Sequence, residues 1–404
     1  MSIIDSNVSR RSFVAGSAAV VAAAGAGAML AGCSSSSSGS ASASASASAS
    51  SEAAPAIEIN DEMEELNTVL LGKDAKIACI IVASQRGYYE DEKLTVNTQV
   101  VSGGFPEAMP MLSDGTVDVL PFGSIPTCTD VGQGDDLVIF GGTVTNGSEA
   151  LVPAANKDDY KSAEDFKGKK IACFRMETGH MVTKSWLRQQ GLKIGDKPED
   201  VDNGDADVAF ILLESMAAEA AAVENGEVDM CFVNSGQGYN FAYKNENLAV
   251  AFQPQELLGH DFPCCRQSTN RAAFEEKKSA LTKFEIANVR AMYDIANDKE
   301  GVIEDIMAYS GQPEDFCEAI TYGLDDYVAA MQFEMDPRTN DVYSFYGDMV
   351  DNGDIQDTNK DLILEHMDST IYKTAVQTLI DRGENKDFYE GLMKKYEKNN
   401  TMGV

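Results

Sequence analysis

A weak internal repeat constrains the fold of this chain more than any other feature of its 404 residues. Residues 66–87 align with residues 170–191 without gaps. Each copy begins with a short apolar run, continues through a polar loop and then has apolar residues at helical spacing. Each copy also ends in a glycine, which is common just after the end of a helix. The repeat therefore predicts two similar units, each beginning with a strand, a loop and a helix.

A second match extends both units. Residues 112–119 resemble residues 223–230, and both stretches read as a helix end, a glycine and a buried strand. The second copy contains a longer acidic loop, around residues 200–207. Each unit then reads strand, loop, helix, strand, helix, strand, an alternation that builds a parallel sheet with helices on its faces. We predict an α/β fold of two lobes, each a mainly parallel sheet flanked by helices.

The rest of the chain completes this plan. Residues 136–145 read as an apolar strand that crosses from lobe one to lobe two, and residues 248–252 read as a return strand. From residue 274 the pattern is helical, and these helices are expected to pack on lobe one. The expected helices are 274–296, 301–309, 314–321, 324–335, 342–352, 372–381 and 386–397. We predict that lobe one comprises 61–143 and 255–404, and lobe two 144–254.

The first 33 residues have the order of an export signal. Arg10 and Arg11 precede a weakly apolar run that ends in Leu30-Ala31-Gly32-Cys33. Paired arginines before an apolar segment are typical of export signals, and Leu-Ala-Gly-Cys resembles the lipobox of bacterial lipoproteins. That resemblance implies that residues 1–32 form a twin-arginine signal peptide and that Cys33 carries lipid. The alternative is an uncleaved segment, since residues 13–31 are about long enough to span a bilayer.

The following residues suit a tethered protein outside the cytoplasm. Residues 33–60 are rich in Ser and Ala, a composition that forms a flexible tether. We expect an extracytoplasmic protein, lipid-anchored to the outer face of the bacterial cell membrane or periplasmic. The net charge of −33 argues against nucleic acid as a partner, because nucleic-acid binding requires a cationic surface.

The cysteines and histidines do not form a recognisable metal or disulfide pattern. Seven cysteines besides Cys33 cannot all pair, and the adjacent Cys264 and Cys265 are poorly placed for a mutual disulfide. Cys173 and Cys231 lie in apolar runs and are expected to be buried strand thiols. The three histidines are too scattered to suggest a zinc site. We predict no bound metal and no cofactor.

The candidate binding residues lie in loops that follow predicted strands, because ligands of open α/β sheets bind beyond the carboxyl ends of strands. In lobe one the candidates are Lys73, Asp74, Ser102, Gly103, Gly104 and Ser124. In lobe two they are Arg175, Thr178, His180, Glu214, Asn234, Ser235, Gln237 and Tyr239. Residues 234–239 combine neutral donors and acceptors with one ring, and form the strongest single candidate segment.

Each charged candidate has two interpretations. Lys73 either grips an anion or is solvated. Arg175 either binds a carboxylate or sulfonate with two hydrogen bonds, or pairs with Glu177. His180 either contacts a ligand or bonds at a helix start. Glu214 suggests an amine on the ligand, and the mixture of signs favours a zwitterion or a polar heteroaromatic solute over nitrate.

The glycines of the segment 102–104 have two interpretations as well. Ser102-Gly103-Gly104 either presents free N–H groups to an acidic group or is a simple tight turn.

Several segments resemble solute-binding proteins for nitrate, sulfonates, taurine and thiamine-pyrimidine precursors. These are residues 83–90 (Ala-Ser-Gln-Arg-Gly-Tyr-Tyr-Glu), 94–96, 112–118 and 163–171 (Ala-Glu-Asp-Phe-Lys-Gly-Lys-Lys-Ile). The resemblance implies a type 2 periplasmic-binding-protein-like fold that closes on a solute and delivers it to an ABC permease. The loop at 72–78 lacks the proline usual before the helix and the histidine of the sulfonate-like members, so the substrate stays open.

Three functions remain after this comparison. The leading one is transport, in which a monomeric binding protein captures a small polar solute (sulfonate-, taurine- or pyrimidine-like) and performs no chemistry. The second is a lipoprotein that senses the same kind of ligand. The third is an enzyme similar to the pyrimidine-forming relatives of this fold, with Cys264, Cys265 and His180 recruited to its site. The export signal and the scarcity of nucleophile–base pairs argue against the enzyme.

Overall fold

The computed structural model of the chain describes residues 57–234, 236–356 and 358–403. The predicted signal peptide, Cys33, nearly all of the tether and the candidate Ser235 lie outside these residues. Within the described part, no helix combines the length and the apolar character that a membrane span requires.

The first half of lobe one follows the predicted alternation. Strand β1 (Glu64–Leu71) pairs in parallel with β2 (Leu94–Val101). Between them lie a 3₁₀ turn (Ala75–Ile77), α1 (Ala78–Gln85) and α2 (Tyr88–Asp91), and after them α3 (Phe105–Ser113) and α4 (Ser124–Gln133). The strand expected near residue 118 is reduced to two bridges, one parallel from Val119 to Thr68 and one antiparallel from Leu120 to Ser268.

Those bridges connect β1 to the antiparallel part of lobe one. Here the strand order is β10 (Pro263–Asn270), β3 (Leu137–Asn146) and β11 (Met331–Phe333). The parallel strands come from the first half of the chain, whereas β10 and β11 return from much later in it.

Lobe two contains a six-stranded sheet of order β6-β7-β5-β8-β4-β9. Strands β5, β6, β7 and β8 are parallel, and β4 and β9 form antiparallel pairs. Their bounds are β4 Ser148–Pro153, β5 Lys169–Phe174, β6 Ile194–Gly195, β7 Val208–Leu213, β8 Met230–Asn234 and β9 Leu248–Phe252. The helices are α5 Thr178–Gln189, α6 Pro198–Asp202, α7 Met216–Glu224 and α8 Pro254–Leu258, with a π-helical turn at Tyr239–Tyr243.

The chain leaves lobe one at Asn146 and Gly147, which join β3 to β4. Both residues have a left-handed backbone, with φ of 61° and 100°. The buried Asn146 bonds to the returning segment three times: its N–H donates to the Phe262 carbonyl at 2.9 Å, its Oδ1 accepts from the Phe262 N–H at 3.1 Å, and its Nδ2 donates to Asp261 at 2.9 Å. The two segments that cross between the lobes are therefore hydrogen-bonded side by side.

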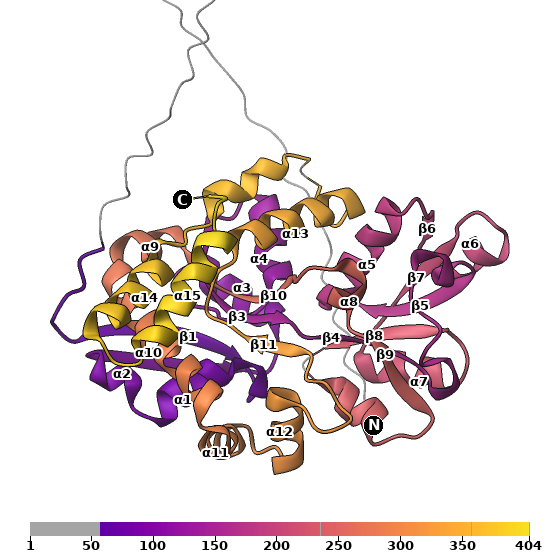
Figure 1. Cartoon of the computed structure of the whole chain (residues 1–404). Helices are drawn as coiled ribbons and strands as arrows, with labels where there is room; N and C mark the ends of the chain where they lie inside the picture. The colour runs from indigo at the N-terminus through magenta and orange to yellow at the C-terminus, as the bar shows by residue number, and fades with distance from the viewer. Residues whose placement is uncertain (1–56, 235, 357, 404) are drawn as a thin grey trace, which may run out of the picture. The chain divides into compact units, whose positions relative to one another are not determined.

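The C-terminal region is largely helical, as predicted. Its helices are α9 Arg271–Glu276, α10 Lys278–Asn297, α11 Lys299–Ser310, α12 Glu314–Tyr322, α13 Thr339–Asn352, α14 Thr370–Arg382 and α15 Lys386–Asn399. Helix α10 contacts α1, β1 and α14, and α14 contacts α15, so this group lies on lobe one (Figure 1). Helix α13 also contacts α5 of lobe two.

The expected helix at 324–335 is wrong. Gly323, with φ of 78°, ends α12, and Leu324 pairs with Tyr327 in a tight turn. The segment then forms β11, whose residues pair with the edge of β3. An unpaired strand edge offers a row of N–H and C=O groups, and pairing with it overrides a helical apolar pattern.

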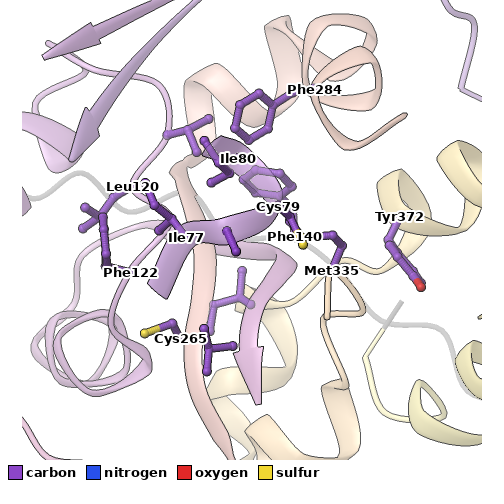
Figure 2. Packing of buried hydrophobic residues seen from close by; sticks show 14 of the residues in the cluster. Ile77, Cys79, Ile80, Leu120, Phe122, Phe140, Cys265, Phe284, Met335 and Tyr372 are labelled. Carbon is purple, nitrogen blue, oxygen red and sulfur yellow. The ribbon is translucent and has the colours of Figure 1, made fainter. Parts of the chain in front are cut away.

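One large apolar core fills lobe one and includes the C-terminal helices. Figure 2 shows Ile77, Cys79, Phe140, Phe284 and Tyr372 in this core; they come from the 3₁₀ turn, α1, β3, α10 and α14, respectively. All five side chains are at most 1% exposed. Since these elements are distant in the sequence, the core joins the two chain segments of lobe one into one body.

Lobe two has separate cores on the two faces of its sheet. Along β4, Ala150 and Val152 face one core and Leu151 faces the other, as the alternation of side chains in a strand requires. The prediction that Cys173 and Cys231 are buried strand thiols is confirmed, since they are 1% and 0% exposed on β5 and β8.

Candidate functional site

A cleft of about 890 Å³ lies where loops of both lobes meet the turn before α12. It is bounded by the segments that follow β1, β5, β7 and β8, and by the start of α3. Its position beyond the carboxyl ends of parallel strands is where open α/β sheets bind ligands. The candidate residues that line it are Lys73, Asp74, Gly103, Gly104, Arg175, Glu214, Asn234 and Gln237.

The remaining described candidates do not line the cleft. Ser102 is exposed beside it, and Ser124 and Thr178 are buried at the starts of α4 and α5. His180 borders a separate cavity of about 630 Å³. The buried Tyr239 donates its hydroxyl hydrogen to Asp315 at 2.8 Å, which connects lobe two to α12.

Two cations from opposite lobes reach the cleft without a partner. Arg175 follows β5 and is exposed. Every other arginine of the described residues makes a hydrogen bond, whereas Arg175 makes none there and has no ion pair. Lys73 is exposed and likewise has no ion pair in the described part. An anion between the lobes would meet positive charge from both sides.

The alternative pairing of Arg175 with Glu177 is wrong, because Glu177 caps α5 instead. Its two carboxylate oxygens accept from the backbone N–H groups of Gly179 at 2.8 Å and His180 at 2.7 Å. The side chain of Ser215 caps α7 in the same way, and Asp74 caps the 3₁₀ turn. These helix starts therefore have no free N–H groups to offer a ligand at their capped positions.

Helix α3 begins at the cleft without a side-chain cap. Gly104, the residue before it, has φ of 67°. The neighbouring Gly103 N–H is held by Glu107 of the same helix, at 2.8 Å from Oε2. The partial positive charge of this helix start suits an acidic group, and Glu107 places one carboxylate there already.

Lys76 is a second lysine that lines the cleft. Lys76 lies 3.6 Å from the Asp74 carboxylate and 5.3 Å from the centre of the Phe122 ring. It also lies near two free thiols, Cys264 and Cys265, whose sulfur atoms are 3.8 Å apart. The hydrogen bond from Cys264 lowers the pKa of the Cys265 thiol to about 6; burial opposes this and the charge of Lys76 adds to it. Unlike Lys73, Lys76 has negative partners within the protein.

Apolar side chains form much of the cleft, although none of them was among the candidate binding residues. They are Leu71, Phe105, Pro106, Phe174, Met176, Leu213, Met216 and Phe316. Phe174 precedes Arg175 and Phe105 follows the glycines, so the repeat could have placed both at the cleft. No sequence signal placed Phe316 or Gln312 there, because only the tertiary packing of the C-terminal helices brings them to it.

The described residues contain no group of three or more His, Cys, Asp or Glu side chains arranged to hold a metal ion.

Two α/β lobes, two crossing segments and a cleft between strand ends define the type 2 periplasmic-binding-protein fold. Residues 74–301 match the family model described as NMT1/THI5 like, and the chain belongs to this family.

Known proteins resemble this chain in sequence or in structure. A stretch of 106 residues, 26% of this chain, is 30% identical to a protein of Escherichia coli (strain K12) named for binding aliphatic sulfonates, and spans about a third (33%) of that protein. The nitrate-binding protein NrtA from Synechocystis PCC 6803 superposes with a TM-score of 0.60 at 14% identity, over 80% of this chain and 90% of NrtA. The desulfurization enzyme DSZB superposes with 0.52 at 11% identity, over 79% and 99%. At 14% and 11% identity, the likeness to these two structures shows the fold alone.

Proposed function

We propose that this chain is an extracytoplasmic solute-binding lipoprotein of an ABC importer. It captures a small sulfonate-, taurine- or pyrimidine-like solute between its lobes and delivers it to the permease, without chemistry or a cofactor. The observation that carries the proposal is the pair of unpartnered cations, Lys73 and Arg175, at the cleft of a chain whose net charge is −33. In so acidic a protein, cations left without a carboxylate partner are available to a ligand.

The proposed setting follows from the N-terminal sequence. Lipid at Cys33 would hold the protein, as a monomer, at the outer face of the membrane, and residues 33–60 would let it reach the permease. The names of the relatives support import of a small solute, and the acidic composition supports a partner other than nucleic acid.

The test is a set of calorimetric titrations of the full-length chain with taurine, alkanesulfonates, nitrate, pyrimidines and amino acids. An anion or zwitterion should bind without being consumed. Arg175→Met and Lys73→Met should each weaken binding by about tenfold or more, the usual effect of losing a hydrogen bond to a charged group. Lys193→Met, which removes an exposed lysine of lobe two outside the cleft, is the matched control.

The titrations test the role of the two cations and distinguish the candidate functions. Equal affinities for the wild type and the two cleft variants would refute the role of the cations. Consumption of a compound would favour an enzyme, for which the likeness to DSZB and the dithiol beside Lys76 are the supporting observations. A sensor and a transporter bind a solute alike. Measuring whether uptake of the bound solute stops in cells that lack the permease distinguishes the two functions.

A further inference from the structure

We propose that the cleft continues into a side chamber that receives the far end of the solute, and that the solute is elongated: an anionic head, an apolar body and a terminal ammonium group. This inference rests on the proposed function and names the class of solute. The side chamber is the cavity of about 490 Å³ between α3, α4 and the loop after β5.

Shared lining residues place the two cavities side by side. Phe105, Pro106 and Met176 line both the cleft and the side chamber. Phe105 and Met176 are half-buried, and they come from opposite lobes. A solute whose head contacts Lys73 and Arg175 in the cleft can therefore extend past Phe105 and Met176 without leaving the protein surface.

The part of the side chamber next to the cleft is apolar. Met109, Pro110 and Pro126 continue the surface that begins at Phe105. None of these side chains can satisfy a polar group, so they suit methylene groups or a ring. Each methylene group buried against such a surface strengthens binding by about fourfold.

The other lining residues of the side chamber give it a negative charge. Asp130 and Asp135 line it, and no lysine, arginine or histidine does. The Asp135 carboxylate accepts a hydrogen bond from Ser113 at 2.8 Å, whereas the Asp130 carboxylate has neither a hydrogen bond nor an ion pair in the described part of the chain. Burial, and then the neighbouring Asp135, raise the pKa of Asp130 to about 6. An ammonium group of the solute beside Asp130 and Asp135 would relieve the repulsion between the two carboxylates, whereas an anionic end group of the solute would add to this repulsion.

The charges along the two cavities are thus ordered. Unpartnered cations lie in the cleft, apolar side chains lie where the cavities meet, and unneutralised carboxylates line the side chamber. A solute with an acidic head and an ammonium tail matches this order, and an α,ω-diacid of the same length does not.

The experiment compares three sulfonates at each chain length from two to ten carbons, ending in a methyl, an ammonium or a carboxylate group. Dissociation constants are measured by calorimetry with the full-length chain. We expect affinity to rise with length once the chain enters the side chamber, and the ammonium form to bind about fivefold tighter than the methyl form at those lengths. The carboxylate form should be the weakest of the three.

Substitutions test whether the two carboxylates of the side chamber cause the preference among the three end groups. Asp130→Asn with Asp135→Asn should abolish the preference among the three end groups and leave taurine binding unchanged, which also shows that the variant is folded. Asp158→Asn, an exposed acid of lobe two, is the control and should keep the preference. Met109→Gln should weaken only the long solutes.

Three outcomes would overturn the inference. Affinity that is independent of length and end group would remove the side chamber from the site, while taurine binding would leave the proposed function standing. A preference that survives in the double variant would place the selecting charge elsewhere. Failure of every sulfonate, short and long, would overturn this inference, whereas the proposed function would fall only if every compound of the calorimetric panel also failed to bind.

Discussion

Replacing Glu149 by Gln should remove a large pH dependence of stability. Glu149 is fully buried at the start of β4. One carboxylate oxygen accepts from the Tyr327 hydroxyl at 2.6 Å, and the other accepts from the Gly238 N–H at 2.9 Å. Burial raises the pKa of Glu149 from its usual value of 4.5 to about 7, although both hydrogen bonds act to lower it.

The size and direction of the effect follow from these two pKa values. At a pH between 4.5 and about 7, Glu149 keeps its proton in the folded chain and releases it in the unfolded chain, so ionisation of Glu149 destabilises the fold. The contribution of Glu149 to stability is complete below pH 4.5 and is lost as the pH rises through about 7. At 1.36 kcal/mol per pKa unit, the interval corresponds to roughly 3 kcal/mol. A glutamine imitates the protonated acid, because its amide can donate to the Tyr327 oxygen while its carbonyl accepts from Gly238.

The assay is urea unfolding of the wild type and Glu149→Gln at intervals from pH 5 to pH 8. We expect similar free energies of unfolding at pH 5 and a variant that is more stable by roughly 3 kcal/mol at pH 8. Other buried acids, such as Glu219 and Glu285, are present in both proteins, so the difference between the two curves isolates Glu149. Parallel curves across this range would refute the reasoning.

Three further predictions test other parts of the structure. Asn146→Ala should destabilise the chain by about 2–4 kcal/mol in urea unfolding, because it removes two side-chain hydrogen bonds at a left-handed residue; a loss under 1 kcal/mol would contradict this. Gly142→Ala should prevent folding or cost several kcal/mol of stability in thermal unfolding, because the new Cβ would overlap two backbone carbonyl oxygens. Gly391→Ala, whose Cβ would lie in open space on α15, should stabilise the chain by up to about 1 kcal/mol. Similar effects at the two positions would refute the packing argument. Glu107→Gln should strengthen anion binding up to about fivefold in calorimetry, because it removes a carboxylate from the start of α3; unchanged affinity would show that this carboxylate does not compete with the ligand.

The sequence was sufficient to predict most strands and helices of the two repeated units. Apolar periodicity and glycines such as Gly87 and Gly191, both with positive φ, repeat in each lobe, and local signals of this kind survive in the fold. The helix expected at 324–335 failed because the edge of β3 pairs with Met331 and its neighbours, and no local pattern reports such a distant partner.

The candidate site was predictable to the level of loops and less so for single residues. Lys73 and Arg175 follow strands, and strand ends meet at one edge of a sheet. Glu177 was one of two candidate partners of Arg175, whereas its carboxylate accepts from the N–H groups of Gly179 and His180 at the start of α5. The apolar residue Phe316 could not be placed, because it reaches the cleft only through the packing of α12.

The hydrogen bonds between Asn146 and the returning segment make the connection between the lobes a two-stranded ribbon. Such a ribbon is stiffer in some directions than in others. Out-of-plane bending needs only small changes in backbone dihedral angles, whereas sliding one strand along the other would break the bonds of Asn146 to Phe262 and Asp261. A movement of one lobe against the other must therefore accommodate this ribbon as well as the contact of α13 with α5.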